Sequence, residues 1–206
     1  MSQYLQIHPE TPQSRLVNQV VALLHRGGVI VYPTDSGYAL GCQIGDKAAL
    51  DKIRRIRELD DKHDFTLMCR DLSELANYAR VDNAAFRLIR NATPGPYTFV
   101  LRATNEVPRR LLHPKKKTIG IRVPDNAIAQ ALLEALGEPL MNASLVLPSG
   151  DDYLLDPDEI YEQLENRIDL MINGGFCPSE PTTVVDLTSG YPEVLRRGAG
   201  DPDRFE

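Results

Sequence analysis

Hydroxyl, carboxyl and guanidinium side chains interrupt several segments of this chain that otherwise read as buried strands. The clearest case is GGVIVYPTDSGYALGC at 27–42, where Thr34, Asp35 and Ser36 separate two apolar runs. Polar groups at the end of a buried strand commonly lie at a sheet edge where ligands bind. The alternative is local, because Asp35 and Ser36 can also close an Asx or Ser turn.

One arginine, Arg122, stands inside the apolar segment TIGIRVP. Because arginine is rarely buried without a partner, we expect its guanidinium either to face a cleft or to form an ion pair with one of the chain's many acidic residues. The two threonines that open the segment PTTVVDL, Thr182 and Thr183, are a weaker signal of the same kind.

Charge is distributed unevenly along a chain whose formal net charge is −6. Positions 102–123 hold seven basic residues and one acid (7 − 1 = +6), whereas 150–206 hold four arginines and fourteen acids (4 − 14 = −10). The basic stretch can hold phosphates although the whole chain repels them. The alternative is a solvated loop. The candidates for RNA binding are Arg109, Arg110, Lys115, Lys116 and Lys117.

Several other classes of site find no support in the sequence. Neither GxxxxGK[ST] nor GxGxxG occurs, so a nucleotide would have to be held by dispersed residues. The four histidines lie in unrelated contexts, and the three cysteines form no CxxC pair, which predicts neither a protein-bound metal nor a disulfide framework. No apolar run approaches the ~20 residues of a membrane span, and the N-terminus does not read as a secretory signal. We expect a cytoplasmic protein with buried free thiols and no membrane partner.

Hydrophobic periodicity and breaker residues predict alternating strands and helices without an internal repeat or a linker. The expected helices are 13–26, 46–57, 72–78, 84–91, 128–136 and 158–166, with caps at Thr11-Pro12, Asp46, Asn126 and Asp156. The expected strands are 29–32, 38–44, 65–69, 97–101, 118–124, 140–147, 168–175, 182–187 and 192–198. This order favours one α/β domain over 1–206, with a mixed sheet covered by helices.

Seven segments, taken in order, resemble the YrdC-like domain family, which makes threonylcarbamoyl-adenylate for tRNA modification. They cover nearly the whole chain: GGVIVYPTDSGYALGC, TPGPYTFVL, TIGIRVP, EPLMNAS, IDLMINGG, PTTVVDL and VLRRG. The variant PTDSGYALG and the chain length resemble the YciO branch most. The resemblance implies the YrdC/RibB-like fold, a single-domain, three-layer α/β architecture in which a twisted mixed sheet carries helices on both faces.

The resemblance also implies a concave cleft that holds ATP and L-threonine. Carried over to this chain, Thr34 and Tyr38 line the threonine and nucleotide pocket, and Arg122 and Arg196 supply charge to phosphates or a carboxylate. The resemblance further implies substrate contacts by Ser144, Thr182 and, more weakly, Thr98. The implied reaction joins bicarbonate, L-threonine and ATP to give threonylcarbamoyl-AMP and pyrophosphate, with Mg²⁺ brought by the nucleotide. The family also implies a positive cleft for double-stranded RNA, and tRNA or double-stranded RNA is therefore an expected partner.

The family's Lys-x-Arg-Pro motif aligns with Arg57-Glu58-Leu59-Asp60, and its Ser-x-Asn motif aligns with Ser144-Leu145-Val146. Arg57 stands where the family's Lys-x-Arg-Pro motif has its lysine, and Leu59 stands where that motif has its arginine. In the Ser-x-Asn motif the serine persists as Ser144, but the asparagine is Val146. With Arg57 and Ser144 as catalytic candidates, we expect a weak or altered synthase, because two lost polar groups can slow the reaction by a factor on the order of 10²–10⁴. The alternative is a nucleotide- or RNA-binding protein without efficient synthesis.

Overall fold

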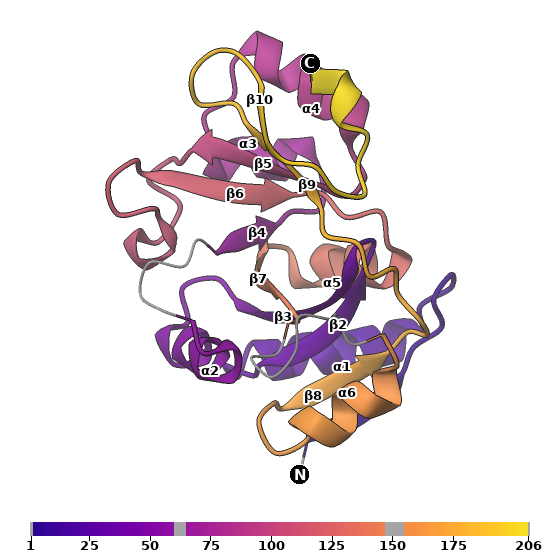
Figure 1. The fold of residues 1–206 in the computed structure, drawn as a ribbon. Helices are drawn as coiled ribbons and strands as arrows, with labels where there is room; N and C mark the ends of the chain where they lie inside the picture. The colour runs from indigo at the N-terminus through magenta and orange to yellow at the C-terminus, as the bar shows by residue number, and fades with distance from the viewer. Residues whose placement is uncertain (1, 60–64, 147–154, 206) are drawn as a thin grey trace.

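The structure of the protein is a computed structural model that describes residues 2–59, 65–146 and 155–205. Within them, ten strands form one sheet in the order β1-β8-β2-β3-β7-β4-β6-β5-β9-β10 (Figure 1). Four strand pairs are parallel and five are antiparallel, so the sheet is mixed. The strands are β1 (Gln3–Gln6), β2 (Ile30–Thr34), β3 (Gly37–Gln43), β4 (Thr66–Met68), β5 (Tyr97–Arg102), β6 (Thr118–Arg122), β7 (Leu140–Ser144), β8 (Leu170–Asn173), β9 (Thr183–Asp186) and β10 (Glu193–Arg196).

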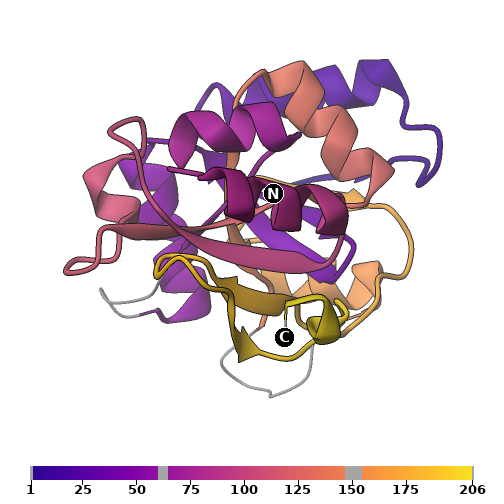
Figure 2. The ribbon, with the colours of Figure 1, turned by 90° about the horizontal axis from the view of Figure 1, so that it is seen from above.

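Helices cover both faces of this sheet, and each face has its own apolar core. The helices are α1 (Ser14–Leu24), α2 (Lys47–Arg57), α3 (Leu72–Tyr78), α4 (Asn83–Ala92), α5 (Ala127–Leu136) and α6 (Pro157–Leu164), with 3₁₀ turns η1 (Arg109–Leu111) and η2 (Pro202–Phe205). One core joins α1 and α5 to the sheet, and the other joins α2, α3, α4 and α6 to it. Figure 2 shows α1 (indigo) and α5 (salmon) side by side, with the C-terminal segment (yellow) on the opposite side. The predicted three-layer α/β fold is confirmed.

Side-chain alternation decides which strand residues meet which core. In β2, Ile30 and Tyr32 pack with α1 and α5, whereas Val31 packs with the other core. The same alternation holds in β7, where Leu140 belongs to the α1–α5 core and Met141 to the other. Because successive side chains of a strand point to opposite faces, these residues fix the face that every neighbouring position presents.

Local signals set most helix ends where they were predicted. The side chain of Asp46 accepts a hydrogen bond from Ala49 N at 2.9 Å and that of Asn126 accepts one from Ala129 N at 3.0 Å, so both residues are N-caps. Asp156 caps α6 in the same way. The cap predicted at Thr11-Pro12 is wrong, because Thr11 contacts His8 and the N-cap of α1 is Gln13, with the helix beginning at Ser14.

Two strand predictions also need correction. Strand β1 was not predicted from the sequence. It is a four-residue edge strand in which only Tyr4 and Leu5 are half-buried, and four residues are too few to show an alternating pattern. The apolar run predicted at 140–147 is a strand only to Ser144, and position 147 lies outside the described residues.

All three cysteines are free and buried, and burial raises the pKa of Cys42 to about 12 and that of Cys177 to about 11. The prediction that the three cysteines are buried free thiols is therefore confirmed.

Candidate functional site

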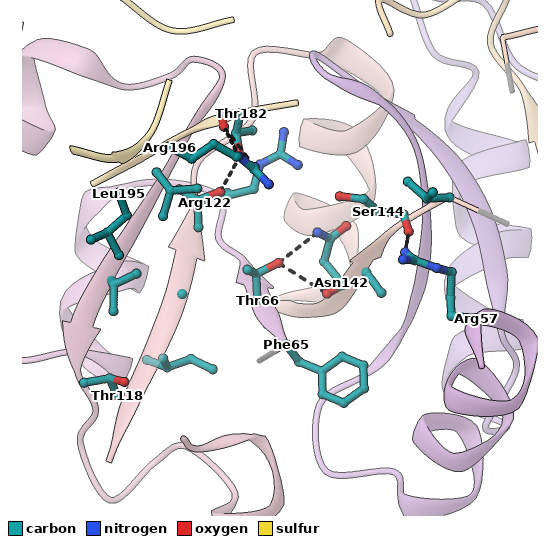
Figure 3. Close-up of a pocket in the computed structure, with 17 residues that line it drawn as sticks. Arg57, Phe65, Thr66, Thr118, Arg122, Asn142, Ser144, Thr182, Leu195 and Arg196 are labelled. Carbon is teal, nitrogen blue, oxygen red and sulfur yellow. Dashed lines mark hydrogen bonds between the residues drawn. The ribbon is translucent and has the colours of Figure 1, made fainter. Parts of the chain in front are cut away.

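A cleft with a cavity volume of about 380 Å³ lies over strands β7, β4, β6, β5 and β9 (Figure 3). Its floor belongs to the sheet face that α1 and α5 cover elsewhere, since Thr66 and Asn142 share that face with Met68 and Leu140 of the α1–α5 core. The described residues that line the cleft are Arg57, Phe65, Thr66, Thr98, Val100, Thr118, Ile119, Gly120, Arg122, Asn142, Ala143, Ser144, Val146, Thr182, Val184, Leu195 and Arg196.

Strand register brings the floor residues into one row. Thr66 lies opposite Asn142 on one side and opposite Gly120 on the other, and Gly120 lies opposite Val100. A Cβ atom at Gly120 would lie 2.8 Å from Cγ2 of Thr66 and 3.2 Å from Cγ2 of Thr98. The absence of a side chain at Gly120 therefore makes room for a threonine methyl group from each neighbouring strand.

Arg122 both lines the cleft and forms an ion pair, so the two alternatives for it coexist. Its Nη2 lies 2.7 Å from Oδ1 of Asp35 and donates to Oγ of Ser36 at 2.8 Å. The Arg122 and Asp35 side chains are only 3% and 9% exposed, and Asp35 also accepts from Asp125 N. The local turn is made by Thr34 instead, whose Oγ1 donates to Gly37 O at 2.6 Å and accepts from Ser36 N at 3.1 Å. The Thr-Asp-Ser insertion thus anchors an arginine at the cleft.

Arg196 of β10 lies over the cleft, next to β9 and to Thr182, the residue that precedes β9. Its Nε and Nη2 donate to Thr182 O at 3.0 and 2.9 Å, and Nη2 also contacts Oγ1 of Thr182 at 3.1 Å. The Oγ1 atoms of Thr182 and Thr98 are 2.7 Å apart and share a hydrogen bond. These contacts place the predicted residues Arg196, Thr182 and Thr98 in one hydrogen-bonded group.

On the other side of the cleft floor, Arg57 at the end of α2 donates to the backbone carbonyl of Ser144 at the end of β7. Figure 3 shows this pair across the Thr66–Asn142 floor from Arg122 and Arg196. Three arginines therefore reach the cleft from α2, β6 and β10, and none of the described lining residues is acidic. Such a cavity favours an anionic ligand, because each guanidinium offers several N–H donors and a charge that does not titrate near neutral pH.

Thr34 and Tyr38, both predicted to bind substrate, are not among the residues that line the cleft. Thr34 is buried behind Ser36, with their hydroxyl oxygens 3.4 Å apart. The hydroxyl of Tyr38 donates to Gly175 O at 2.6 Å and accepts from Gly174 N at 3.2 Å. In this structure their hydroxyls bind backbone groups of the 34–37 turn and of Gly174 and Gly175, while substrate binding by the two residues stays a prediction.

Three polar cleft residues were missed at the level of sequence: Thr66, Thr118 and Asn142. Asn142 stands in the apolar run EPLMNAS, and a lone amide in a buried strand is the same kind of signal that singled out Arg122. The threonines gave no such signal, because threonine is common in strands for its shape alone.

The basic residues predicted to bind RNA lie elsewhere, on the β5–β6 hairpin. Arg109, Arg110 and Lys115–Lys117 are all exposed. A separate concavity there is lined by Arg80, Arg102, Arg109, Lys116 and Lys117 among other residues, again without an acidic residue in the described lining. Backbone N–H groups of Lys115 and Lys116 donate to Nδ1 of His113, and Lys117 N donates to His113 O, so the three lysines form one ordered turn.

Two absences complete the description. Among residues 2–59, 65–146 and 155–205, no group of three or more histidine, cysteine or acidic side chains is placed to hold a metal ion. Nor does any helix within these ranges have the length and apolarity needed to cross a membrane.

Comparison with known proteins gives the chain a family. A model of the Sua5/YciO/YrdC family, described as telomere recombination, matches residues 22–198. The chain belongs to this family. It is 61% identical to the YciO protein of Escherichia coli strain K12 over 205 residues, and 60% identical to a protein of Haemophilus influenzae over 206 residues, with 100% of each chain covered in both cases.

Solved structures agree with the family assignment. The crystal structure of E. coli YciO superimposes with a TM-score of 0.96 at 61% identity, covering 100% of both chains. The structure of P. abyssi Sua5 complexed with L-threonine gives a TM-score of 0.87 at 24% identity, covering 96% of this chain and 58% of that one. Full-length HypF in a phosphate- and nucleotide-bound form gives 0.72 at 20% identity, covering 88% and 29%. The last two likenesses are evidence for the Sua5/YciO/YrdC fold alone.

The residues that depart from the family's catalytic motifs lie in different environments in the structure. Val146 lines the cleft beside Ser144 and is half-buried. Leu59 is not among the lining residues and instead packs against the core that contains α2. Of the two apolar replacements, only Val146 therefore faces the place where a ligand would lie. Asp60, the last motif position, lies outside the described residues.

Proposed function

We propose that the cleft binds ATP and L-threonine and supports a weak or altered form of L-threonylcarbamoyladenylate synthesis. The observation that carries the proposal is the set of three arginines converging on a cavity whose described lining has no carboxylate. Triphosphate and α-carboxylate are the anionic groups of the two substrates, and arginine binds both in a bidentate manner. L-threonine in Sua5 and nucleotide in HypF, which share this fold, add support.

In the proposed reaction, the amine of threonine bonds to the carbon of bicarbonate and water leaves. An oxygen of the resulting carbamate then attacks the α-phosphorus of ATP, and the bond to pyrophosphate breaks. Arg122 and Arg196 would neutralise charge on the phosphates, and Arg57 would lie beside Ser144 at the opposite end of the cleft. The oxygens of the described lining come from hydroxyls, an amide and the backbone, so Mg²⁺ would arrive with the nucleotide, whose phosphates supply its preferred ligands.

Isothermal titration of the protein with ATP, alone and with saturating L-threonine, tests this proposal. We expect each substrate to tighten the binding of the other, since the two occupy one cleft. D-threonine is the matched control, because it has the same charge and size but the wrong geometry. ATP binding that is undetectable at millimolar concentration, with or without L-threonine and Mg²⁺, would contradict the proposal.

A second function, RNA binding, rests on a different observation. The concavity of the β5–β6 hairpin gathers five cations without an acid in its described lining, and one of them, Arg80, lies outside the basic stretch 102–123. We infer that this surface contacts the phosphate backbone of tRNA or double-stranded RNA. Titration of a labelled RNA duplex and of tRNA at several salt concentrations tests it. Affinity that does not depend on salt would contradict a phosphate contact here.

A further inference from the structure

A chain of hydrogen bonds runs from the buried core to the cleft floor. Tyr32 is fully buried, and its hydroxyl donates to Oδ1 of Asn142 at 2.7 Å. The amide Nδ2 of Asn142 donates to Oγ1 of Thr66 at 2.9 Å, and that hydroxyl lies 3.2 Å from Asn142 O, to which it donates. Gly41 makes room for the arrangement, since a Cβ there would lie 2.8 Å from the Tyr32 ring.

The direction of these bonds follows from counting donors. If the amide of Asn142 were turned over, its nitrogen would donate to Tyr32, and the phenol hydrogen would lose Oδ1 of Asn142, the acceptor that it uses in the described part of the chain. A buried donor without a partner is costly, so the observed orientation is the one in which both hydroxyl hydrogens are used. Burial raises the pKa of Tyr32, outweighing the opposing effect of Arg122, so the phenol keeps its hydrogen and the orientation holds.

This orientation leaves one hydrogen of the Asn142 amide without an acceptor in the described residues. Asn142 is 2% exposed and lines the cleft, and in Figure 3 it lies centrally between the Arg122–Arg196 group and the Arg57–Ser144 pair. Arg122, 2% exposed, likewise has a buried Nε with no hydrogen-bond partner in the described part of the chain. Two buried donors at the same cleft thus have hydrogen-bonding capacity that the described residues do not use.

We propose that Asn142 is a ligand-binding residue whose free amide hydrogen donates to a phosphate, carboxylate or carbamate oxygen, and that Tyr32 is a positioning residue which fixes that amide from behind the floor. The family's Ser-x-Asn motif has its asparagine at the position of Val146. In this chain, Asn142 of β7 would supply an amide to the same cleft from four residues earlier. The inference rests on the proposed function only in taking the cleft as an anion site, and it does not require that the anion be ATP.

The test measures affinity for inorganic pyrophosphate, ATP and L-threonine in three variants. Asn142→Asp keeps the shape and can still accept from Tyr32, and the Thr66 hydroxyl can turn to donate to its second oxygen, but the substitution removes the donor and adds a negative charge. We expect it to weaken pyrophosphate binding by a factor of about 30 or more. Tyr32→Phe should weaken it about 3- to 10-fold through the loosened amide. Tyr161→Phe is the matched control, because its hydroxyl donates to Ser2 O at 2.9 Å, away from the cleft.

A double-mutant cycle distinguishes positioning of Asn142 by Tyr32 from a purely structural role of Tyr32. In an Asn142→Leu background, Tyr32→Phe should have no further effect on affinity, since the group it positions is gone. Equal losses in both backgrounds would overturn the positioning role. Pyrophosphate binding by Asn142→Asp within about 3-fold of the wild type, or no binding of any probe by the wild type, would overturn the ligand role. If the wild type binds pyrophosphate but not ATP, the proposed function fails while the inference about Asn142 is still decided by the variants.

Discussion

The cleft and the β5–β6 hairpin both concentrate positive charge, but they hold it in opposite ways. In the cleft, Arg57, Arg122 and Arg196 each donate to a defined acceptor: a carbonyl, a carboxylate or a threonine. On the hairpin, only the backbone of Lys115–Lys117 is tied down, and within the described residues their ammonium groups form no ion pair. Fixed guanidinium groups select a ligand by geometry, whereas loose ammonium groups attract any polyanion in proportion to its charge.

The largest expected effect concerns stability, and it separates the two regions most clearly. Arg122→Met would leave the buried carboxylate of Asp35 without its partner and should lower the free energy of unfolding by about 3–5 kcal/mol. Lys115→Ala on the hairpin should change it by no more than about 0.5 kcal/mol. Urea denaturation of the two variants measures both effects.

The same experiment has an internal control in the Asp35→Asn/Arg122→Met double variant. Because it removes both charges together, it should recover part of the lost stability. If Arg122→Met is no more destabilising than Lys115→Ala, the ion pair is not what anchors Arg122 at the cleft.

The second effect concerns RNA and salt. Replacing Lys115, Lys116 and Lys117 with alanine should reduce the slope of log affinity against log salt by about 0.9 for each lost phosphate contact, and should lower affinity on the order of 10²-fold near ~0.1 M salt. Fluorescence anisotropy with a labelled duplex measures the slope.

Its matched control removes three charges elsewhere. Arg15, Arg26 and Lys47 are exposed residues outside the hairpin, and their replacement with alanine should leave the slope nearly unchanged. Equal flattening by both triple variants would mean that net charge attracts the RNA and that the hairpin is only a solvated loop.

The third effect tests whether geometry matters in the cleft. Arg196→Lys keeps the charge but cannot reproduce the two bonds from Nε and Nη2 to Thr182 O. We expect about a 10-fold loss of ATP affinity by isothermal titration. Arg197→Lys, at the adjacent exposed position, is the control and should bind ATP like the wild type. Indistinguishable affinities for all three proteins would show that the cleft responds to charge alone.

The smallest effect concerns the missing amide of the family motif. Val146→Asn adds a hydrogen-bonding group at a position that lines the cleft, and we expect it to raise threonine-dependent pyrophosphate release from ATP about 3- to 10-fold. Leu59→Arg, outside the cleft lining, should bring no gain and should cost some stability, since Leu59 packs against the core. A gain from Leu59→Arg that equals the gain from Val146→Asn would contradict this division of the two positions.

Much of the secondary structure could be predicted from the chain because its signals are local. Asp46 and Asn126 cap helices by bonding backbone groups three residues away, and the leucines of α5 recur at helical spacing. Strand β1 could not be predicted in this way, because four residues at a sheet edge carry too little periodicity. The cap of α1 failed since Thr11 had a competing partner in His8.

In the candidate site, too, local features could be predicted from the sequence, whereas contacts between distant residues could not. By itself, the sequence determined which residues were unusual: an arginine within an apolar strand, polar groups in the Thr-Asp-Ser insertion, and a run of lysines between two strands. Only the tertiary structure decided that Asp35 pairs with Arg122, that Tyr32 holds Asn142, and that the lysines lie apart from the cleft. Those contacts join residues 87 and 110 positions apart, and they exist because the strand order β2-β3-β7-β4-β6 sets distant segments side by side, an arrangement that no local periodicity encodes.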